Sequence, residues 1–161
     1  MTELSVDIQM KAGAFDLDVK FVAQGGITVL FGPSGAGKSA TLGAIAGLKT
    51  PQSGRIALDD QVWFDSKRDL PTHQRGVAIV FQSLALFPHM TALENVLYGI
   101  TRELPKAERR LRAEATLERM HVPHLRDRKP RSFSGGEAQR VALARAFATH
   151  PKIVLLDEPF S

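Results

Sequence analysis

The sequence predicts an α/β fold in which a phosphate-binding core carries an antiparallel β part and an inserted helical part. Three observations predict it. Apolar and polar residues alternate over residues 4–10, which is the period of a half-buried strand. A glycine-rich loop at 32–39 lies between an apolar run and a helical stretch. The chain then reads as largely helical between two β-rich apolar runs, at 77–81 and 153–156.

The β elements follow in chain order. Residues 15–21 repeat the alternation of residues 4–10, so the two segments are expected to form an antiparallel pair. A strand is expected at 27–31, before the glycine-rich loop, and a short hairpin at 56–64 around Asp59 and Asp60. The runs 77–81 and 153–156 read as strands buried on both faces, as in a parallel sheet.

The glycine-rich loop fits the pattern G-x-x-x-x-G-K-[ST] and reads Gly32-Pro33-Ser34-Gly35-Ala36-Gly37-Lys38-Ser39. Its backbone N–H groups can form an anion nest, to which the N-terminus of the following helix adds its positive dipole end. Lys38 is placed to reach the β- and γ-phosphates of a nucleotide, and the Ser39 hydroxyl can bind Mg²⁺. A glycine-rich turn with a chance lysine is the alternative, and the strand–loop–helix order disfavours it.

Helices are expected at 92–99, 105–120 and 135–148. Thr91 with Glu94, and Ser134 with Glu137, have the spacing of a capping box, and Pro105 suits a first turn. These elements predict one domain over 1–161. Segments 1–87 and 134–161 would form the β part and core, and 88–133 the helical insert and signature region.

Two acids follow the last apolar run. A carboxylate at the C-terminal end of such a strand lies where ligands bind in open α/β sheets. Asp157 can therefore hold Mg²⁺, and Glu158 can polarise the water that attacks a γ-phosphate. A plain strand end followed by a polar turn is the alternative, and the upstream phosphate loop disfavours it.

Composition excludes several classes of protein. The 161 residues contain no cysteine, so disulfides and thiolate metal sites are excluded. The first residues lack the pattern of a signal peptide, and no apolar run approaches the roughly 20 residues of a membrane span. If the protein acts at a membrane, a partner protein is therefore expected to hold it there.

The net charge of +4 is concentrated in the helical part. Acids are interleaved with the bases and no stacking aromatics accompany them, so a solvated face is favoured over a nucleic-acid patch and no nucleic-acid partner is expected. The bases are Arg102, Lys106, Arg109, Arg110, Arg112, Arg119, Arg126, Arg128, Lys129 and Arg131.

Four motifs in order resemble those of ATP-binding cassette (ABC) transporter ATPases. The loop 32–39 matches the Walker A loop, Gln82 the glutamine of the Q-loop, 134–140 the signature motif, and 155–159 the Walker B strand with its catalytic glutamate. The resemblance covers essentially the whole chain. It departs at Ala40, where the family usually has a hydroxyl residue near the α-phosphate, and at Phe133, which replaces the usual leucine.

The resemblance implies an ABC ATPase fold that binds ATP and Mg²⁺. Gln82 would contact Mg²⁺ and the γ-phosphate and take part in catalysis, beside Glu158. Two subunits would face each other head to tail, with ATP between the loop of one, including Ala40, and Ser134, Gly135 and Gly136 of the other. The subunits would sit on the cytoplasmic face of the inner membrane through an integral permease, and indirectly serve a solute-binding protein. Residues 87–96 would contact that permease.

Among ABC ATPases, the stretches 64–66, 70–71 and 80–89 most resemble ATPases of molybdate importers, with sulfate and iron(III) importers next. A soluble ABC ATPase of DNA repair or translation is the contrasting hypothesis, and its usual long insertions or tandem cassettes are not seen. A non-catalytic nucleotide-binding module is a third, and the presence of both Lys38 and Glu158 disfavours it.

The chain stops soon after the Walker B acids, at Ser161. The family pattern continues with a D-loop, a strand that lies between those at 27–31 and 153–156, and a switch histidine. The chain alone is therefore expected to be a poorly folded fragment that does not turn over ATP.

Overall fold

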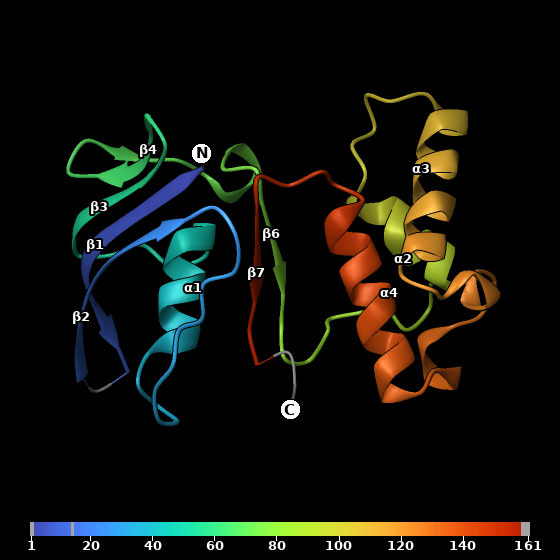
Figure 1. Ribbon diagram of the computed structural model, residues 1–161, viewed down its shortest axis with the longest axis horizontal. Helices are drawn as coiled ribbons and strands as arrows, with labels where there is room; N and C mark the ends of the chain where they lie inside the picture. Colours follow the sequence, from blue (N-terminus) through green and yellow to red (C-terminus); the bar gives the residue numbers. More distant parts are fainter. Residues whose placement is uncertain (1, 14, 159–161) are drawn as a thin grey trace. The chain divides into compact units, whose positions relative to one another are not determined.

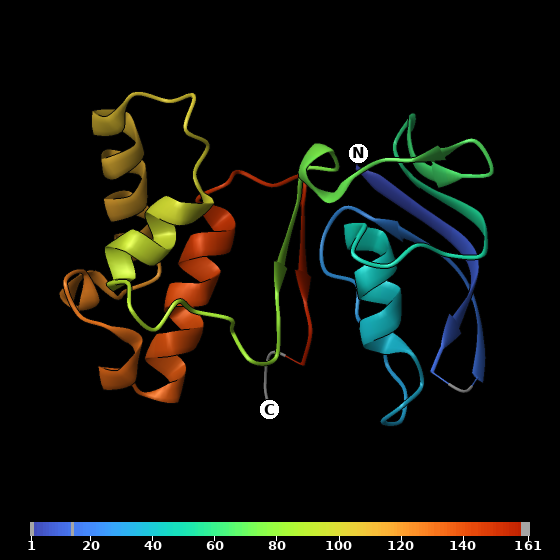
Figure 2. The same ribbon diagram turned by 180° about the vertical axis from the view of Figure 1, so that it is seen from behind.

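The computed structural model describes residues 2–13 and 15–158, which divide into two compact units, Met1–Arg75 and Gly76–Ser161 (Figures 1 and 2). Each unit is described by itself. The first contains β1 Glu3–Ala12, β2 Phe15–Gln24, α1 Lys38–Ala46, β3 Ser53–Leu58, β4 Gln61–Asp65, β5 Arg68–Asp69 and the 3-10 turn η1 Thr72–Gln74. The second contains β6 Val77–Val80, α2 Ala92–Gly99, α3 Lys106–Arg119, η2 Pro123–Leu125, η3 Pro130–Ser132, α4 Gly135–Phe147 and β7 Ile153–Leu156.

The first unit is built on an antiparallel sheet with the strand order β2-β1-β3-β4-β5. The predicted pairing of the first two strands is confirmed, with Leu4 opposite Ala23 and Met10 opposite Leu17. Val6 and Ile8 of β1 are buried as the alternation predicts, and the predicted hairpin at 56–64 forms as β3 and β4.

The C-terminal end of α1 is held by a fully buried arginine that the sequence did not single out. Arg75 Nη1 donates to the carbonyls of Ala44 and Ile45 at 2.8 and 2.9 Å, and Nη2 pairs with Asp69 at 2.8 Å. A cation at this end of a helix is favourable because the last carbonyls lack intrahelical partners. Arg75 thereby anchors the helix that carries the phosphate loop at its other end.

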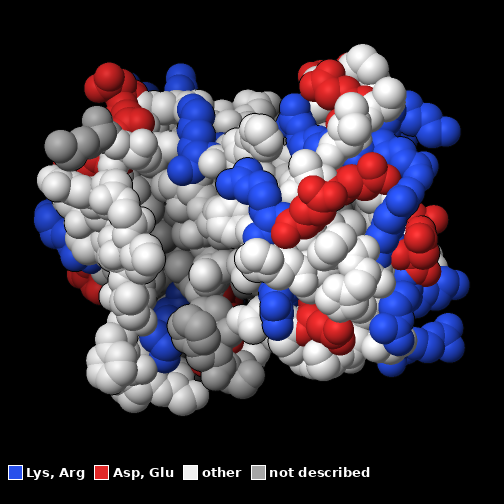
Figure 3. Space-filling view, turned by 45° about the vertical axis from the view of Figure 1, so that its right-hand side comes forward, with Lys and Arg blue, Asp and Glu red and all other residues white. Residues whose placement is uncertain are grey.

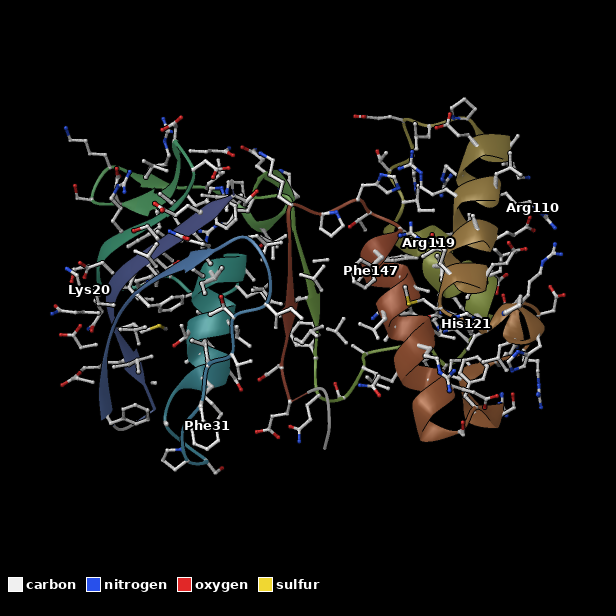
Figure 4. All side chains as sticks on the ribbon, in the orientation of Figure 1. Lys20, Phe31, Arg110, Arg119, His121 and Phe147 are labelled. Atoms are coloured by element: carbon white, nitrogen blue, oxygen red, sulfur yellow. The ribbon has the colours of Figure 1, made fainter. Side chains whose placement is uncertain are left out.

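The predicted strand at 27–31 is wrong for this structure. No described residue pairs with this segment in a ladder, and Ile27, Val29 and Phe31 are 95, 76 and 99% exposed. Phe31 extends from the loop that leads into α1 (Figure 4). A β-prone apolar run becomes a strand only where neighbouring strands accept and donate its backbone hydrogen bonds, and none of the described residues does so.

The second unit contains a two-stranded parallel sheet, in which Val77 lies opposite Ile153 and Val80 opposite Leu156. Both predicted strands are confirmed, but their expected burial on both faces is wrong. Ala78 and Val80 alternate with half-buried residues, and Leu156 is exposed. Among the residues that the structure describes, only two strands pair in this sheet, so both of its edges lack a neighbouring strand.

Three helices make the core of the second unit, and the predicted helices are confirmed. Val96 of α2, Leu117 of α3 and Val141 of α4 are buried in one cluster. Both predicted capping boxes form, at the start of α2 and of α4. Pro105 is the N-cap of α3 rather than a first-turn residue. The sequence-based division into a core and an insert at 88–133 stays a proposal. None of the described helices combines the length and apolar character needed to cross a membrane.

Candidate functional site

The phosphate loop is folded around its own lysine. Lys38 Nζ donates to the carbonyls of Gly32 and Pro33 at 2.9 and 2.8 Å, which brings the charge back over the loop. Gly35 and Gly37 have φ of 81° and 86°, a conformation that L side chains rarely adopt. A Cβ on Gly37 would also lie 2.7 Å from Leu17 Cδ1. The glycines are therefore required by the shape of the loop.

The start of α1 is open to an anion. Gly37 is its N-cap, and among the described residues no side chain caps the helix and no acid lies in its first turn. The helix therefore presents its first-turn N–H groups without a side-chain cap, together with its positive dipole end. An open pocket of about 220 Å³ lies beside it, lined in part by Ala36, Lys38 and Thr41. This donor set fits a nucleotide's phosphates.

Asp157, Glu158 and Gln82 follow the C-terminal ends of the parallel strands β6 and β7. Asp157 N donates to Val80 O at 3.0 Å, so the two strands end together, and Gln82 follows in the turn after β6. Glu158 has a φ of 48°, and non-glycine residues held in this region concentrate at functional sites. The structure thus brings the turn of Gln82 to the two predicted acids, which follow it in the sequence by more than 70 positions. Pro159 lies outside the described residues.

The signature residues form the start of α4. Ser134 is the N-cap, and its Oγ accepts from Glu137 N at 3.3 Å and donates to Glu137 Oε2 at 2.9 Å. The Glu137 carboxylate accepts a hydrogen bond from Ser134 N at 2.7 Å and also contacts His124. These interactions favour the ionised form and lower the pKa of the Glu137 carboxyl to about 2.

The capping box should therefore lose its contribution to stability in acid. The pKa of Glu137 lies below its ordinary value of 4.5 in the folded state, so its contribution is complete above pH 4.5 and is lost as the pH falls towards 2. The free energy of unfolding of the full-length protein can be measured in urea at a series of pH values. Above this pH window it should be larger for the wild type than for Glu137→Gln, and below the window the two values should converge. Glu118→Gln, on the exposed side of α3, is the matched control. A difference that persists unchanged to pH 2 would contradict the assignment.

Gly135 and Gly136 are not required by packing within the described chain. A Cβ added at either position would meet no atom within 4 Å, and neither residue has a positive φ. Glycine in a helix is less stable than alanine by up to about 1 kcal/mol. Two bare glycines at an exposed helix start therefore suit a ligand that approaches the backbone from outside.

The sequence did not indicate Arg145, which holds the turn that contains Gln82. Asn95 lies in the stretch 87–96 predicted to contact the permease, and it holds the segment that follows this turn. Asn95 is fully buried and bonded to the backbone of Phe87, and Arg145 of α4 bonds to the carbonyls of Leu84 and Ala85. Burial lowers the pKa of Arg145 from its ordinary value. A single arginine within the alanine-rich stretch 142–148 was the available signal.

The three residues predicted to bind Mg²⁺ all carry oxygen atoms that can act as ligands. Ser39 lies in the first turn of α1, and Gln82 and Asp157 follow the C-terminal ends of β6 and β7. Their hydroxyl, amide and carboxylate oxygens are the hard ligands that Mg²⁺ prefers. The donor chemistry therefore fits this ion.

Comparison with known proteins assigns the family. A family model described as ABC transporter matches residues 16–161. A protein of Rhodospirillum rubrum named "Molybdenum import ATP-binding protein ModC" is 42% identical over 160 residues, which is 98% of this chain and 43% of that protein. Proteins of the same name from Rhodopseudomonas palustris and Pseudomonas syringae pv. tomato are 45 and 40% identical, over 94 and 100% of this chain and 41 and 45% of their own length.

The chain thus spans less than half the length of these relatives. The family match covers the β part from residue 16 onwards, the phosphate loop, the helical part and the two acids that follow β7. It confirms the family and the ABC ATPase fold that the four motifs implied. The chain belongs to the ABC transporter family.

Proposed function

We propose that this chain is part of the ATP-binding and ATP-hydrolysing subunit of an importer, and that the imported solute is molybdate. The observation that carries the proposal is the open phosphate loop at α1 in a chain whose relatives are named for molybdenum import. The solute rests on those relatives alone, because an ATPase subunit need not contact what is transported. Sulfate and iron(III) are the next candidates.

In this proposal each site residue has one role. The loop N–H groups and Lys38 bind the β- and γ-phosphates, and Ser39 with Asp157 holds Mg²⁺, which neutralises the charge that develops there. Gln82 contacts the ion and the γ-phosphate. Glu158 accepts a proton from the attacking water, which has to be held in line with the γ-phosphate. Ala40 leaves the α-phosphate without the hydroxyl contact usual in the family.

One partner in this proposal is another ABC ATPase subunit, arranged head to tail with the first. The bare N–H groups of Gly135 and Gly136, together with Ser134, would bind the γ-phosphate held by the partner's loop. An added Cβ at either glycine would meet no described atom within 4 Å, which supports this arrangement. The Ser134 hydroxyl would exchange its bond to Glu137 for one to the phosphate.

The permease would dock on α2 and the segment before it. An open pocket of about 650 Å³ lies there, with Met90 and Tyr98 among its apolar lining and Arg102 and Arg109 among its basic lining. Arg109 Nε is buried without a hydrogen-bond partner among the described residues. Such a pocket suits an amphipathic segment that brings a carboxylate. Docking of this kind would place the protein at the cytoplasmic face of the inner membrane.

The basic residues of the helical part do not favour the soluble, nucleic-acid-associated alternative. Arg110 and Arg126 both pair with Glu114, and Arg112 pairs with Glu108. Acidic and basic side chains are interspersed on the helical face shown in Figure 3. A nucleic-acid surface would instead concentrate unpaired positive charge with stacking aromatics.

The experiment that tests the proposal is uptake in cells that lack the full-length gene. Wild-type protein should restore molybdate accumulation, measured as cell-associated molybdenum at submicromolar supply, and Lys38→Ala should not. Sulfate and iron(III) uptake are measured in the same cells. Restoration of one of these instead of molybdate would correct the solute. Normal uptake of all three in the deletion strain would favour the soluble alternative.

A further inference from the structure

The turn after β6 has a backbone conformation that its side chains do not favour. Leu84 and Ala85 have φ of 58° and 45°, in the left-handed region, where residues with a Cβ are uncommon. Leu84 N donates to Phe81 O at 2.8 Å, which closes the turn around Gln82 and Ser83. Such a conformation persists only where its surroundings hold it.

Arg145 holds this turn from α4. Its Nη1 donates to Ala85 O at 2.8 Å and its Nη2 to Leu84 O at 2.9 Å, while the guanidinium lies 5.6 Å from the centre of the Phe87 ring. The planar fork of arginine suits two adjacent acceptors, which a lysine cannot bridge in the same way. Arg145 therefore binds the carbonyls of the two residues with strained backbone.

Asn95 holds the following stretch on α2. Its Oδ1 accepts from Phe87 N at 2.9 Å, and its Nδ2 donates to the carbonyls of Phe87 and Met90 at 3.2 Å and of Thr91 at 2.9 Å. The side chain is fully buried, so these bonds have no water to replace them. The segment from Leu84 to Thr91 is thus tied to two helices.

The two helices meet at the same place. A Cβ on Gly99 of α2 would lie 3.0 Å from Arg145 O and 3.4 Å from Arg145 Cγ. Glycine permits this close approach, which sets the position of Arg145 relative to α2. The same helix α4 begins at its N-cap Ser134. A continuous helix transmits a displacement along its length because its turns are hydrogen-bonded to one another.

We propose that Arg145 is a positioning residue that fixes the turn of Gln82 to α4, so that Gln82 and the signature residues Ser134–Gly136 move as one body. The inference rests on the proposed function for the roles of Gln82 and Ser134. Arg145 acts through Gln82 and through the helix, and it touches neither nucleotide nor ion. The proposed permease-docking pocket is lined in part by Met90, which belongs to the segment from Leu84 to Thr91. A partner that moves this segment would therefore shift Gln82 and Ser134–Gly136 together.

A double-mutant cycle on ATP turnover tests this in the full-length protein assembled with its permease. Arg145→Gln should lower kcat about tenfold, because a small displacement of a catalytic group strongly lowers the rate of the chemical step. KM for ATP should stay within about twofold of the wild-type value. In the Gln82→Ala background, Arg145→Gln should lower kcat by less than about twofold more, since its effect runs through Gln82. Losses that multiply would overturn the proposal and would indicate a general structural role.

Two further variants make the test decisive. Arg119→Gln removes an exposed guanidinium at the C-terminal end of α3 and should leave kcat unchanged. Arg145→Lys should lose less than Arg145→Gln, and it replaces that variant in the cycle if Arg145→Gln does not fold. Amide exchange over residues 83–90 should be faster in Arg145→Gln than in Arg119→Gln, and equal rates would overturn the inference.

The proposed function is tested separately in the same assay. If Glu158→Gln abolishes turnover while the cycle shows independent losses, only the inference on Arg145 fails. If Glu158→Gln and Lys38→Ala both turn over ATP at the wild-type rate, the proposed function fails and the inference fails with it.

Discussion

Replacing Lys38 by alanine in the full-length protein is expected to lower its affinity for Mg-ATP by about 10- to 100-fold. A hydrogen bond to a charged group contributes about 1.5–3 kcal/mol, and each 1.4 kcal/mol is about tenfold in affinity. The Lys38 ammonium already lies over the loop, bonded to the carbonyls of Gly32 and Pro33. Calorimetric titration with Mg-ATP measures the effect.

Two variants separate loss of charge from loss of loop structure. Lys38→Met keeps the aliphatic stem and should lose affinity as Lys38→Ala does. Lys20→Ala removes a lysine from an exposed pair with Asp7 on the same unit, and it should bind as the wild type does. Unfolding temperatures without nucleotide should agree among the variants. Wild-type affinity in Lys38→Ala would remove the phosphate-loop assignment.

Replacing Glu158 by glutamine should block turnover while ATP still binds. The amide fills the same space and cannot accept a proton from water, and general base catalysis contributes about 10²- to 10⁴-fold. Phosphate release at saturating ATP should therefore fall by at least about 100-fold, with affinity changed by less than about twofold. Glu118→Gln makes the same chemical change on the exposed side of α3 and should release phosphate normally.

The same variant reports on the proposed head-to-tail pair. ATP that is bound but not hydrolysed should hold two Glu158→Gln copies together, which light scattering after gel filtration detects. Adding Ser134→Arg should keep the copies apart, because it fills the helix start that would approach the partner's phosphate. Normal phosphate release in Glu158→Gln would move the base to another residue.

Those parts of the site that depend on neighbouring residues in the chain were predicted from the sequence. The phosphate loop needs glycines with positive φ next to a helix start, and the pattern at 32–39 contains them. The cap at Ser134 needs only Glu137 three residues later, and it forms as predicted. Short-range hydrogen bonds of this kind are encoded in the spacing of a few residues.

The residues that hold the site in place could not be predicted in the same way. Arg75 and Arg145 bond to carbonyls 31 and 61 positions away in the chain, and each is an ordinary polar residue in its local context. Their roles depend on which backbone groups the fold leaves without partners nearby. Only the packed structure brings those groups within reach.

The sequence by itself determined the helices, the capping boxes of α2 and α4, the phosphate loop and the family. Tertiary structure alone decided which apolar runs became strands. The runs 27–31 and 153–156 have the same β-prone composition, yet only Ile153–Leu156 pairs, in register with β6, while Phe31 stays exposed. The physical reason is that a strand is stabilised by hydrogen bonds to a neighbouring strand, and β6 lies more than 70 residues away in the sequence from β7. Composition sets the propensity of a segment, and the partner beside it sets its structure.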